Sequence, residues 1–353
     1  MIVLGSTGSI GVNTLNIARE FNLDIEILVA GNNIDLLNQQ IAEFNPTKVV
    51  IANKKDLENV LHDNVSYGED SILEAIYGSN SSLVVNALVG FAGLRPTIES
   101  IKLNKKVALA NKESLVVAGM FIDTSKIVPI DSEHFGLKYL LNDKKVDKMI
   151  ITASGGSFRD TPLNQLAYMS PKEALNHPNW SMGKKITIDS ATMTNKLFEL
   201  LEAKWLFDID NLDAIIESKS IIHALIDFID GSTTLHVANT DMRLPIAYAI
   251  LDQVDRQILK PIDLLKVKEL SFQKITSDRY PIWNIKDDIL KNPHLGVVIN
   301  AANEVAIKKF LNRQIGFLDI SKIVLECYDR FYNFLPKNLD DIFEIDKEVR
   351  SSI

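Results

Sequence analysis

The sequence predicts an α/β protein whose N-terminal part is a doubly wound parallel sheet, followed by a central α+β domain and a small C-terminal helical domain. Three observations predict the first part. Short runs rich in β-branched residues alternate with helical patterns, a glycine-rich string follows the first run, and polar residues follow later runs. The predicted strands are Ile2–Leu4, Ile25–Ala30, Val49–Ala52, Leu83–Asn86, Val107–Ala110 and Ile127–Ile130, with helical spacing over Ile34–Phe44 and Leu94–Ile101 between them.

Length and composition narrow the possible classes of protein. At 353 residues, with 46% hydrophobic and 24% charged residues, the chain is expected to be an ordinary globular protein of two or three domains. No apolar run approaches a membrane span, so we expect no membrane role. A net charge of -8 argues against a nucleic-acid partner, because duplex affinity comes largely from lysine and arginine.

The one cysteine, Cys327, excludes an internal disulfide and fits a reducing compartment. It lies in an apolar helical pattern, which indicates a buried structural thiol rather than a nucleophile. The N-terminus shows neither a signal peptide nor a transit pattern. We therefore expect a cytoplasmic protein.

The glycine-rich string runs from Gly5 through Thr7, Gly8, Ser9 and Ile10 to Gly11, and a helix is predicted from Val12 to Phe21. Glycines let the backbone approach a pyrophosphate, and the helix start attracts its negative charge. Its position between the first strand and a helix favours dinucleotide binding over a plain tight turn. The spacing, however, departs from the commoner G-x-G-x-x-G.

The end of the second predicted strand bears on the choice of dinucleotide. An NAD enzyme normally has an acidic residue there for the ribose 2′-hydroxyl, whereas this chain has Gly31, Asn32 and Asn33 after Ala30. The sequence therefore favours NADP. No lysine or arginine stands in this turn to grip a 2′-phosphate.

Asp131 and Glu133 follow the apolar run that ends at Ile130. In an extended backbone the two carboxylates would point the same way and form half of an oxygen-rich site for Mg²⁺ or Mn²⁺; the alternative is solvated loop charge. Lys112 follows the strand Val107–Ala110, at the sheet edge where ligands bind in open α/β folds. It is either a substrate contact or an exposed lysine in a first helical turn.

Beyond Glu133 the pattern changes. A strand over Lys148–Ser154 opens into a long segment, residues 155–183, that contains His177 and Trp180. So long a stretch with little amphipathic signal predicts a lid or binding loop in which Trp180 closes over a ligand. The alternative is that the indole anchors the loop to the core.

A short strand is predicted over Ile186–Asp189, with Ser190 as N-cap of a helix that runs to about Phe207. Asn195 and Glu199 then share one face of this helix, with Lys196 beside them. A serine, an amide and a lysine near a helix start suit a phosphate. The alternative is an amphipathic surface helix with an incidental ion pair.

The last part of the chain contains a hairpin pattern and then helices. Ile221–Ile229 and Thr233–Val237 predict a hairpin that belongs to a buried sheet or a subunit interface. A connecting stretch runs from Lys260 to Tyr280, and helical periodicity dominates from Ile285. We predict domains at 1–131 (nucleotide binding), 132–262 (catalytic) and 285–353 (helical), with a linker at 263–284.

Several short strings along the chain can be taken together: 5–11, 109–115, 131–134, 154–156, 177–183, 189–193 with Asn195, Lys196 and Glu199, and 300–304. In this order, and over nearly the whole chain, they resemble the 1-deoxy-D-xylulose 5-phosphate reductoisomerase family. The resemblance implies rearrangement and reduction of 1-deoxy-D-xylulose 5-phosphate to 2-C-methyl-D-erythritol 4-phosphate for isoprenoid synthesis. It also implies NADPH, one of Mg²⁺, Mn²⁺ or Co²⁺, and a homodimer.

The resemblance also implies site residues. Asp131, Glu133 and Glu199 would hold the metal, and with Lys112 and His177 they form the expected catalytic set. The expected NADPH contacts are Gly5, Thr7, Gly8, Ser9, Ile10, Gly31, Asn32, Asn33, Asn111, Glu113 and Gly183. The expected sugar-phosphate contacts are Lys112, Ser132, Ser154, His177, Trp180, Ser190, Asn195, Lys196 and Glu199. One departure is that the family often shows Gly-Lys-Asn where this chain has Gly31, Asn32 and Asn33.

Two other functions fit parts of the sequence. An NAD(P)-dependent polyol or hydroxyacid dehydrogenase shares the nucleotide domain, although it has no need of three carboxylates at a metal. A non-catalytic nucleotide sensor would use the hairpin for partners. Metal-dependent NADPH oxidation distinguishes the expected enzyme from both.

Overall fold

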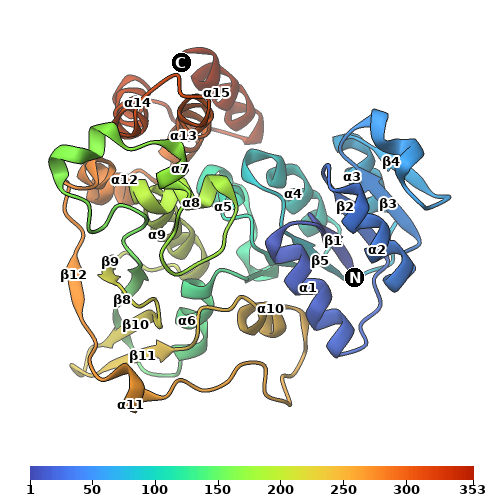
Figure 1. Ribbon diagram of the computed structural model, residues 1–353, viewed down its shortest axis with the longest axis horizontal. Coiled ribbons are helices and arrows are strands. Elements are labelled where there is room, and N and C mark those ends of the chain that lie inside the picture. Colours follow the sequence, from blue (N-terminus) through green and yellow to red (C-terminus); the bar gives the residue numbers. More distant parts are fainter. The chain divides into compact units, whose positions relative to one another are not determined.

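The computed structural model describes residues 1–353, which group into two compact units. The first unit comprises residues 1–114, 123–131 and 241–259, and the second comprises residues 115–122, 132–240 and 260–353. The three domains predicted from the sequence stay a prediction. The predicted fold class is confirmed, because the chain is α/β with a parallel sheet, a second sheet and C-terminal helices (Figure 1).

The first unit is built on a seven-stranded sheet with the order β4-β3-β2-β1-β5-β6-β7, in which every paired strand is parallel. Its strands are β1 (Ile2–Leu4), β2 (Ile27–Ala30), β3 (Lys48–Ile51), β4 (Val65–Tyr67), β5 (Leu83–Asn86), β6 (Lys106–Leu109) and β7 (Ile127–Pro129). The strand order reverses between β1 and β5, and the glycine-rich string directly follows β1. In open α/β sheets this is where ligands bind.

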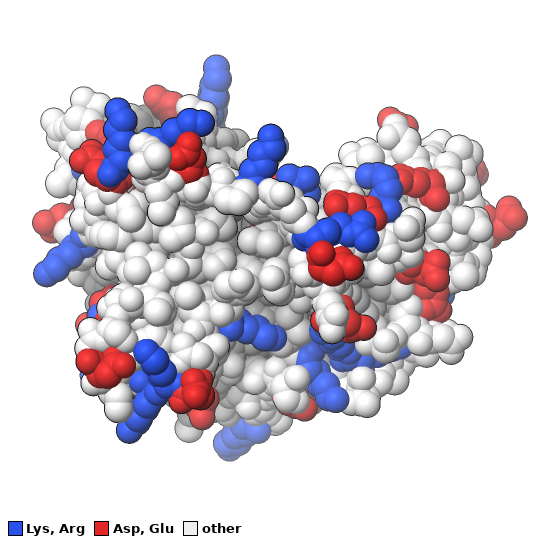
Figure 2. All heavy atoms as spheres, turned by 90° about the horizontal axis from the view of Figure 1, so that it is seen from below, with Lys and Arg blue, Asp and Glu red and all other residues white.

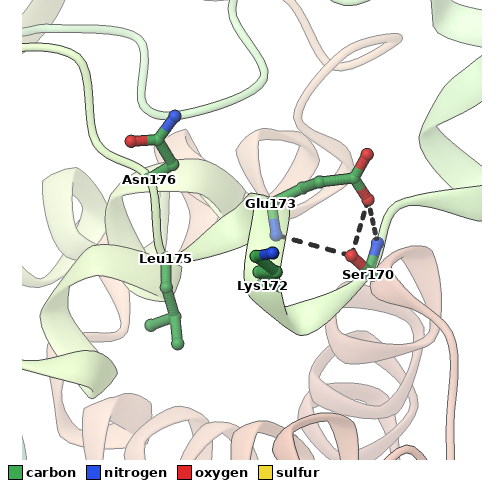
Figure 3. Close-up of a pocket in the computed structure, with 5 residues that line it drawn as sticks. All are labelled: Ser170, Lys172, Glu173, Leu175 and Asn176. Atoms are coloured by element: carbon green, nitrogen blue, oxygen red, sulfur yellow. Dashed lines mark hydrogen bonds between the residues drawn. The ribbon is translucent and has the colours of Figure 1, made fainter.

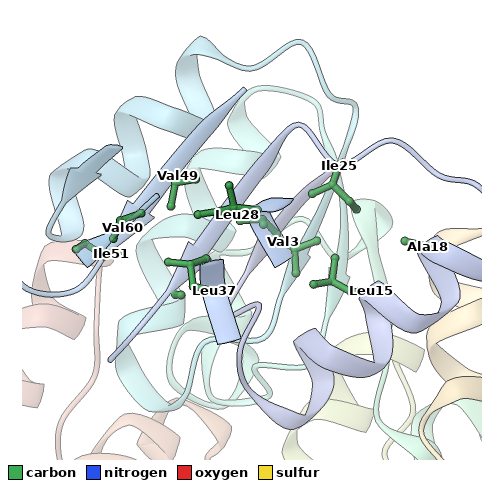
Figure 4. Packing of buried hydrophobic residues seen from close by; sticks show 11 residues of the cluster. Val3, Leu15, Ala18, Ile25, Leu28, Leu37, Val49, Ile51 and Val60 are labelled. Carbon is green, nitrogen blue, oxygen red and sulfur yellow. The ribbon is translucent and has the colours of Figure 1, made fainter. Parts of the chain in front are cut away.

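Helices cover both faces of this sheet. They are α1 (Ser9–Glu20), α2 (Ile34–Phe44), α3 (Glu69–Gly78), α4 (Leu94–Lys102) and α10 (Arg243–Ile250), while α5 (Glu113–Ala118) starts in this unit and ends in the second. On one face Val3 and Leu28 pack against Leu15 and Leu37 of α1 and α2 (Figure 4). Ile2, Leu4, Ile27 and Val29 face the other way, with Ala75 and Ile76 of α3. The alternation explains why these strands are apolar throughout.

The sequence missed two elements of this unit. β4 has only three residues at the sheet edge and none of them is buried, so its apolar signal is weak. Helix α10 comes from far along the chain, and its Ile246 and Ala247 pack with Ile17 and Val85 against the sheet. No local pattern gives that long-range contact.

The second unit contains a five-stranded mixed sheet with the order β11-β10-β8-β9-β12. Its strands are β8 (Val146–Ala153), β9 (Leu212–Glu217), β10 (Ile222–Phe228), β11 (Thr233–Val237) and β12 (Phe272–Lys274). The predicted hairpin is confirmed as β10 and β11, which pair antiparallel. The predicted connecting stretch is wrong in part, because it contains α11 (Leu264–Val267) and β12, which pairs with β9.

The remaining helices of this unit are α6 (Ser132–Leu140), α7 (Pro171–Ala174), α8 (Lys184–Thr192), α9 (Thr194–Phe207), α12 (Lys286–Lys291), α13 (Gly296–Leu311), α14 (Phe317–Arg330) and α15 (Leu339–Ser351). Helices α13, α14 and α15 pack together near the C-terminus, as the helical periodicity predicts (Figure 1). Cys327 on α14 is free and buried, as predicted, and burial raises the pKa of its thiol. Short 3-10 helices complete the chain at residues 54–59, 90–93, 119–121, 124–126, 163–168, 281–285 and 293–295.

Two local predictions are wrong. The strand predicted over Ile186–Asp189 is part of α8, so Ser190 lies inside this helix and does not cap the next one. β-Branched residues favour a strand locally, but Ile188 packs with Ala306 and Phe310 in an apolar cluster that a helix satisfies. The extended backbone predicted over Asp131 and Glu133 is also wrong, because α6 begins at Ser132.

On the face shown in Figure 2, acidic and basic side chains are interspersed, and neither sign covers a continuous area. No helix combines the length and apolar character that a membrane crossing requires.

A polar network closes the amino end of the first sheet. The carboxylate of Glu26 accepts hydrogen bonds from the Ser79 hydroxyl at 2.7 Å and from the backbone N–H of Asn80 and Ser81 at 3.1 and 2.9 Å. The Lys105 ammonium donates to the carbonyls of Ser79 and Ser81 at 2.9 and 2.6 Å. Burial alone would raise the pKa of Glu26, but the hydrogen bonds lower it from 4.5 to about 2.

We predict that Glu26→Gln destabilises the protein by about 1–2 kcal/mol at pH 7, the scale of one or two lost hydrogen bonds to a charged group. Because the pKa is depressed on folding, the contribution is full above about pH 4.5 and is lost as the pH falls toward about 2. Urea unfolding as a function of pH measures this, with Glu74→Gln on α3 as the control. A stability gap as large at pH 2.5 as at pH 7 would contradict the assignment.

Candidate functional site

Three carboxylates converge after β7, at the start of α6 and in the middle of α9. Asp131 directly precedes α6, Glu133 is in its first turn, and Glu199 is on α9. One carboxylate oxygen from each lies within 4.8 Å of the others. Glu199 is only 1% exposed. The three residues that the resemblance implies as metal ligands therefore lie together, although the extended backbone predicted for Asp131 and Glu133 is wrong.

Two lysines neutralise much of this negative charge. The Lys112 ammonium lies 2.7 Å from Asp131, and the Lys196 ammonium bridges Glu133 at 2.8 Å and Glu199 at 2.5 Å. All five side chains are at most 15% exposed. Carboxylate oxygens are the donors that hard divalent cations prefer, so this donor set fits Mg²⁺ or Mn²⁺.

Neighbouring side chains hold the carboxylates. The Ser132 hydroxyl donates to Glu133 at 2.5 Å, and the Asn195 amide donates to Glu199. Asn195 and Glu199 therefore share a face of α9, as predicted. The alternative of an amphipathic surface helix is wrong, since Leu197, Leu200 and Leu201 are buried and so is Lys196.

Sequence reasoning gave no role to two residues behind this cluster. The His134 Nε2 lies 2.8 Å from the Glu199 carbonyl oxygen, and its Nδ1 lies 3.3 Å from a Glu202 carboxylate oxygen. Both side chains are fully buried. They tie α6 to α9 and so fix Glu133 relative to Glu199. The signal was present, because Glu202 follows Glu199 at helical spacing and His134 follows Glu133.

A second cluster surrounds His177. Its Nε2 lies 2.9 Å from the Ser154 hydroxyl and 3.3 Å from the Ser190 hydroxyl. Its Nδ1 accepts from the backbone N–H of Asn179 and Trp180 at 3.2 and 3.0 Å. Because Nδ1 is an acceptor, the ring proton is on Nε2 and points at the two serines.

The charge state of His177 follows from its surroundings. Burial, followed by the positive charges of Arg159 and Lys196, lowers the pKa of His177 from 6.5 to about 4. The imidazole is therefore neutral at physiological pH and donates one hydrogen bond. With two hydroxyls and a lysine nearby, the cluster offers several donors to an oxyanion.

The segment predicted as a lid is held by hydrogen bonds and by a contact between aromatic rings. Ser170 and Glu173 form a capping box at the start of α7, beside a surface pocket that Lys172, Leu175 and Asn176 also line (Figure 3). The Asn179 amide donates to the Ser218 carbonyl at 2.8 Å and to the Ser220 hydroxyl at 2.6 Å. The Trp180 ring lies edge-on to His223 at 6.2 Å. Closure over a ligand stays a prediction.

The glycine-rich string forms a tight loop before α1. Gly5 has φ +86°, and a Cβ on Gly11 would lie 2.2 Å from the Gly5 carbonyl oxygen, so both positions require glycine. Gly8 is the N-cap of α1 without a side-chain capping bond, and Gly8 and Ser9 are exposed beside the partly buried Thr7 and Ile10. The helix N-terminus thus presents its N–H groups to solvent, as an anion site requires.

Other predicted nucleotide contacts lie in the same unit. Gly31, Asn32 and Asn33 are exposed after β2; Asn33 caps α2, and Asn32 accepts from the Asn53 amide at 2.6 Å. Asn111 and Glu113, by contrast, are buried. The Asn111 amide donates to the carbonyls of Leu88 and Gly90 at 2.9 and 2.8 Å, so its side chain holds a loop. Gly183 belongs to the second unit, as the exposed N-cap of α8.

Comparisons with known proteins cover nearly the whole chain. Family models for 1-deoxy-D-xylulose 5-phosphate reductoisomerase match residues 1–119, and models for its C-terminal domains match residues 127–207 and 237–352. The reductoisomerase of Nautilia profundicola is 59% identical, with 99% of this chain and 98% of that protein covered. That of Wolinella succinogenes is 52% identical with the same coverage. The chain belongs to the 1-deoxy-D-xylulose 5-phosphate reductoisomerase family.

Solved structures agree with this membership. A crystal structure of DOX-P reductoisomerase in complex with NADPH, fosmidomycin and magnesium superposes with a TM-score of 0.93 at 33% identity, covering 99% of this chain and 96% of that one. The Zymomonas mobilis reductoisomerase in complex with NADPH gives 0.88 at 35% identity, with the same coverage.

Membership confirms the predicted function. The protein is an NADPH- and metal-dependent oxidoreductase that converts 1-deoxy-D-xylulose 5-phosphate to 2-C-methyl-D-erythritol 4-phosphate. The dehydrogenase without rearrangement and the non-catalytic sensor are both excluded as its function.

Proposed function

We propose that the reductoisomerase reaction takes place at the two clusters described above, with Asp131, Glu133 and Glu199 as ligands of Mg²⁺, Mn²⁺ or Co²⁺. The observation that carries the proposal is the convergence of the three carboxylate oxygens within 4.8 Å. Solved relatives that hold magnesium support it. When bound, the cation polarises the substrate carbonyl and lowers the pKa of the adjacent hydroxyl.

The residues around the carboxylates orient the substrate in this proposal. Lys112 and Ser132 contact the sugar oxygens, and the 2.7 Å ion pair between Lys112 and Asp131 holds both side chains in place. His134 and Glu202 keep α6 and α9 in register, so that the carboxylates of Glu133 and Glu199 keep their spacing. Fixed ligands lose little freedom when the substrate binds.

The phosphate end of the substrate binds the His177 cluster in this proposal. Ser154, Ser190 and the neutral His177 each donate a hydrogen bond, while Asn195 and Lys196 extend the donor set and Trp180 shields it from water. Binding energy from the phosphate is remote from the reacting carbons. This binding energy can therefore be used to orient the carbon chain of the substrate for rearrangement.

NADPH supplies the hydride, and the loop before α1 binds its pyrophosphate. The proposed contacts are Gly5, Thr7, Gly8, Ser9, Ile10, Gly31, Asn32, Asn33, Asn111, Glu113 and Gly183. For the first five, the exposed helix N-terminus and the close backbone approach at Gly5 and Gly11 support the assignment. For Asn111 and Glu113, which are buried, family resemblance is the support.

We predict that Glu199→Gln lowers turnover at least ~100-fold, because losing a charged ligand weakens both the hold on the cation and its charge stabilisation. NADPH affinity should stay within about 2-fold, since the predicted nucleotide contacts do not include Glu199. Steady-state rates and Mn²⁺ titration by electron paramagnetic resonance measure this, with Glu326→Gln on α14 as control. Normal Mn²⁺ affinity in Glu199→Gln would remove this residue from the metal site.

We predict that the enzyme prefers NADPH to NADH and that Asn32→Lys lowers the Michaelis constant for NADPH several-fold, by adding a positive charge for the 2′-phosphate. Asn32→Gln is the control, since either substitution disturbs the hydrogen bond from Asn53. Initial rates with both cofactors measure the change. Equal use of NADH and NADPH by the unmodified enzyme would contradict the preference for NADPH that this turn predicts.

We propose that the enzyme is a homodimer whose contact includes the edge strand β11, where Leu235 and Val237 are exposed. An apolar, unpaired edge is a usual place for strand association. Leu235→Lys should give monomers in sedimentation velocity, whereas Leu265→Lys, at an exposed leucine on α11, should not. A dimer unaffected by Leu235→Lys would exclude this edge.

We propose a cytoplasmic location, supported by the single unbridged cysteine. Cell fractionation tests this.

A further inference from the structure

A polar contact lies buried behind the His177 cluster, between α8 and α13. The amide nitrogen of Asn303 on α13 donates to the Asp189 carboxylate on α8 at 2.6 Å. Asn303 is fully buried and Asp189 is 2% exposed. The other carboxylate oxygen of Asp189 pairs with Lys185 at 2.8 Å, one turn earlier on α8. Nothing in the reaction itself requires this contact.

Apolar side chains of α8 and α13 also pack together. Ile188 and Ala191 of α8 belong to one cluster with Ala306, Ile307 and Phe310 of α13. Apolar contacts are non-directional, so they constrain the rotation of a helix about its own axis less tightly than a directional bond does. The hydrogen bond from Asn303 is directional and supplies that constraint.

The rotation of α8 matters because Ser190 directly follows Asp189. Side-chain atoms lie about 5 Å from a helix axis, so a turn of about 10° moves the Ser190 hydroxyl by about 1 Å. That hydroxyl lies 3.3 Å from the His177 Nε2, in the cluster assigned to the phosphate. The backbone of Gly156 supports α8 on the other side, since a Cβ there would lie 2.5 Å from the Ser190 carbonyl oxygen.

The chemistry of Asn303 also argues against a role in packing alone. Its Oδ1 has no hydrogen-bond partner although it is buried. A buried polar atom without a partner costs free energy, and leucine has nearly the same shape without that cost. The amide is therefore explained by the bond that it does make.

We propose that Asn303 is a positioning residue for substrate-phosphate recognition: it holds Asp189, and through α8 it aims the Ser190 hydroxyl at the phosphate. The proposal rests on the proposed phosphate site. A misplacement of about 1 Å can cost up to 100-fold in rate, so the effect of losing this bond should be measurable.

The test is the variant Asn303→Leu, with inorganic phosphate as a competitive inhibitor. We expect the Michaelis constant for 1-deoxy-D-xylulose 5-phosphate and the inhibition constant for phosphate to rise together, each about 10-fold. The Michaelis constant for NADPH and the affinity for Mn²⁺ should stay within about 2-fold. Asp189→Asn keeps an acceptor for Asn303 and should show a smaller rise, about 3-fold.

Ile307→Val is the matched control, because it loosens the same cluster of α8 and α13 without touching Asp189. It should lower the melting temperature and leave both phosphate-dependent constants unchanged. An equal rise in Ile307→Val and Asn303→Leu would show that general packing is responsible and would overturn the proposal. If Asn303→Leu fails to fold, Asp189→Asn and Ile307→Val still give the comparison.

The variant Ser190→Ala distinguishes a failure of this proposal from a failure of the proposed phosphate site on which it rests. If Ser190→Ala leaves the phosphate inhibition constant unchanged, the phosphate site itself is wrongly assigned. If Ser190→Ala raises that constant but Asn303→Leu and Asp189→Asn do not, the phosphate site stands and the positioning role of Asn303 is refuted.

Discussion

The site in the second unit depends on the ion pairs made by the ammonium group of Lys196. It bridges Glu133 and Glu199, which come from different helices and are both largely buried. Carboxylates so close together repel one another, and burying them without a counter-charge is costly. Each buried charge in the site is therefore stabilised by an opposite charge beside it. The directional bonds of His134 behind them set the spacing of the two helices.

One residue with a left-handed backbone conformation, Met193, joins the two helices that carry residues of both clusters. Met193 has φ 70°, which ends α8 and lets α9 begin immediately in a new direction. A left-handed conformation is costly for such a residue and persists only where the surroundings impose it. Here Met193 is buried. As a result, Ser190 before the break and Asn195, Lys196 and Glu199 after it belong to one compact region.

The sequence was sufficient for those parts of the fold that repeat or follow local rules. The strands β1 to β3, the glycine-rich loop, the hairpin and the shared face of Asn195 and Glu199 follow from periodicity and turn chemistry. It failed where tertiary packing overrides propensity, as at Ile186–Asp189. It also failed at α10, whose contacts are distant in sequence. His134 and Glu202 were missed because each supports other residues, and their spacing from Glu133 and Glu199 indicates a role only once α6 and α9 are known to pack together.

The electrostatics of the His177 cluster explain how neutral groups would bind the phosphate at the proposed site. Two backbone N–H groups occupy Nδ1 and so place the ring proton on Nε2, while burial and nearby positive charge hold the pKa at about 4. His177 and the two serines are thus neutral hydrogen-bonding groups, which at the proposed site would orient the phosphate without adding net charge. Positive charge near His177 comes from Arg159 and from Lys196, which also pairs with the carboxylates. Lys196 pairs with two carboxylates and also contributes positive charge at His177. If the proposed sites hold, a cation bound by the carboxylates would therefore leave more of the lysine's charge to the phosphate.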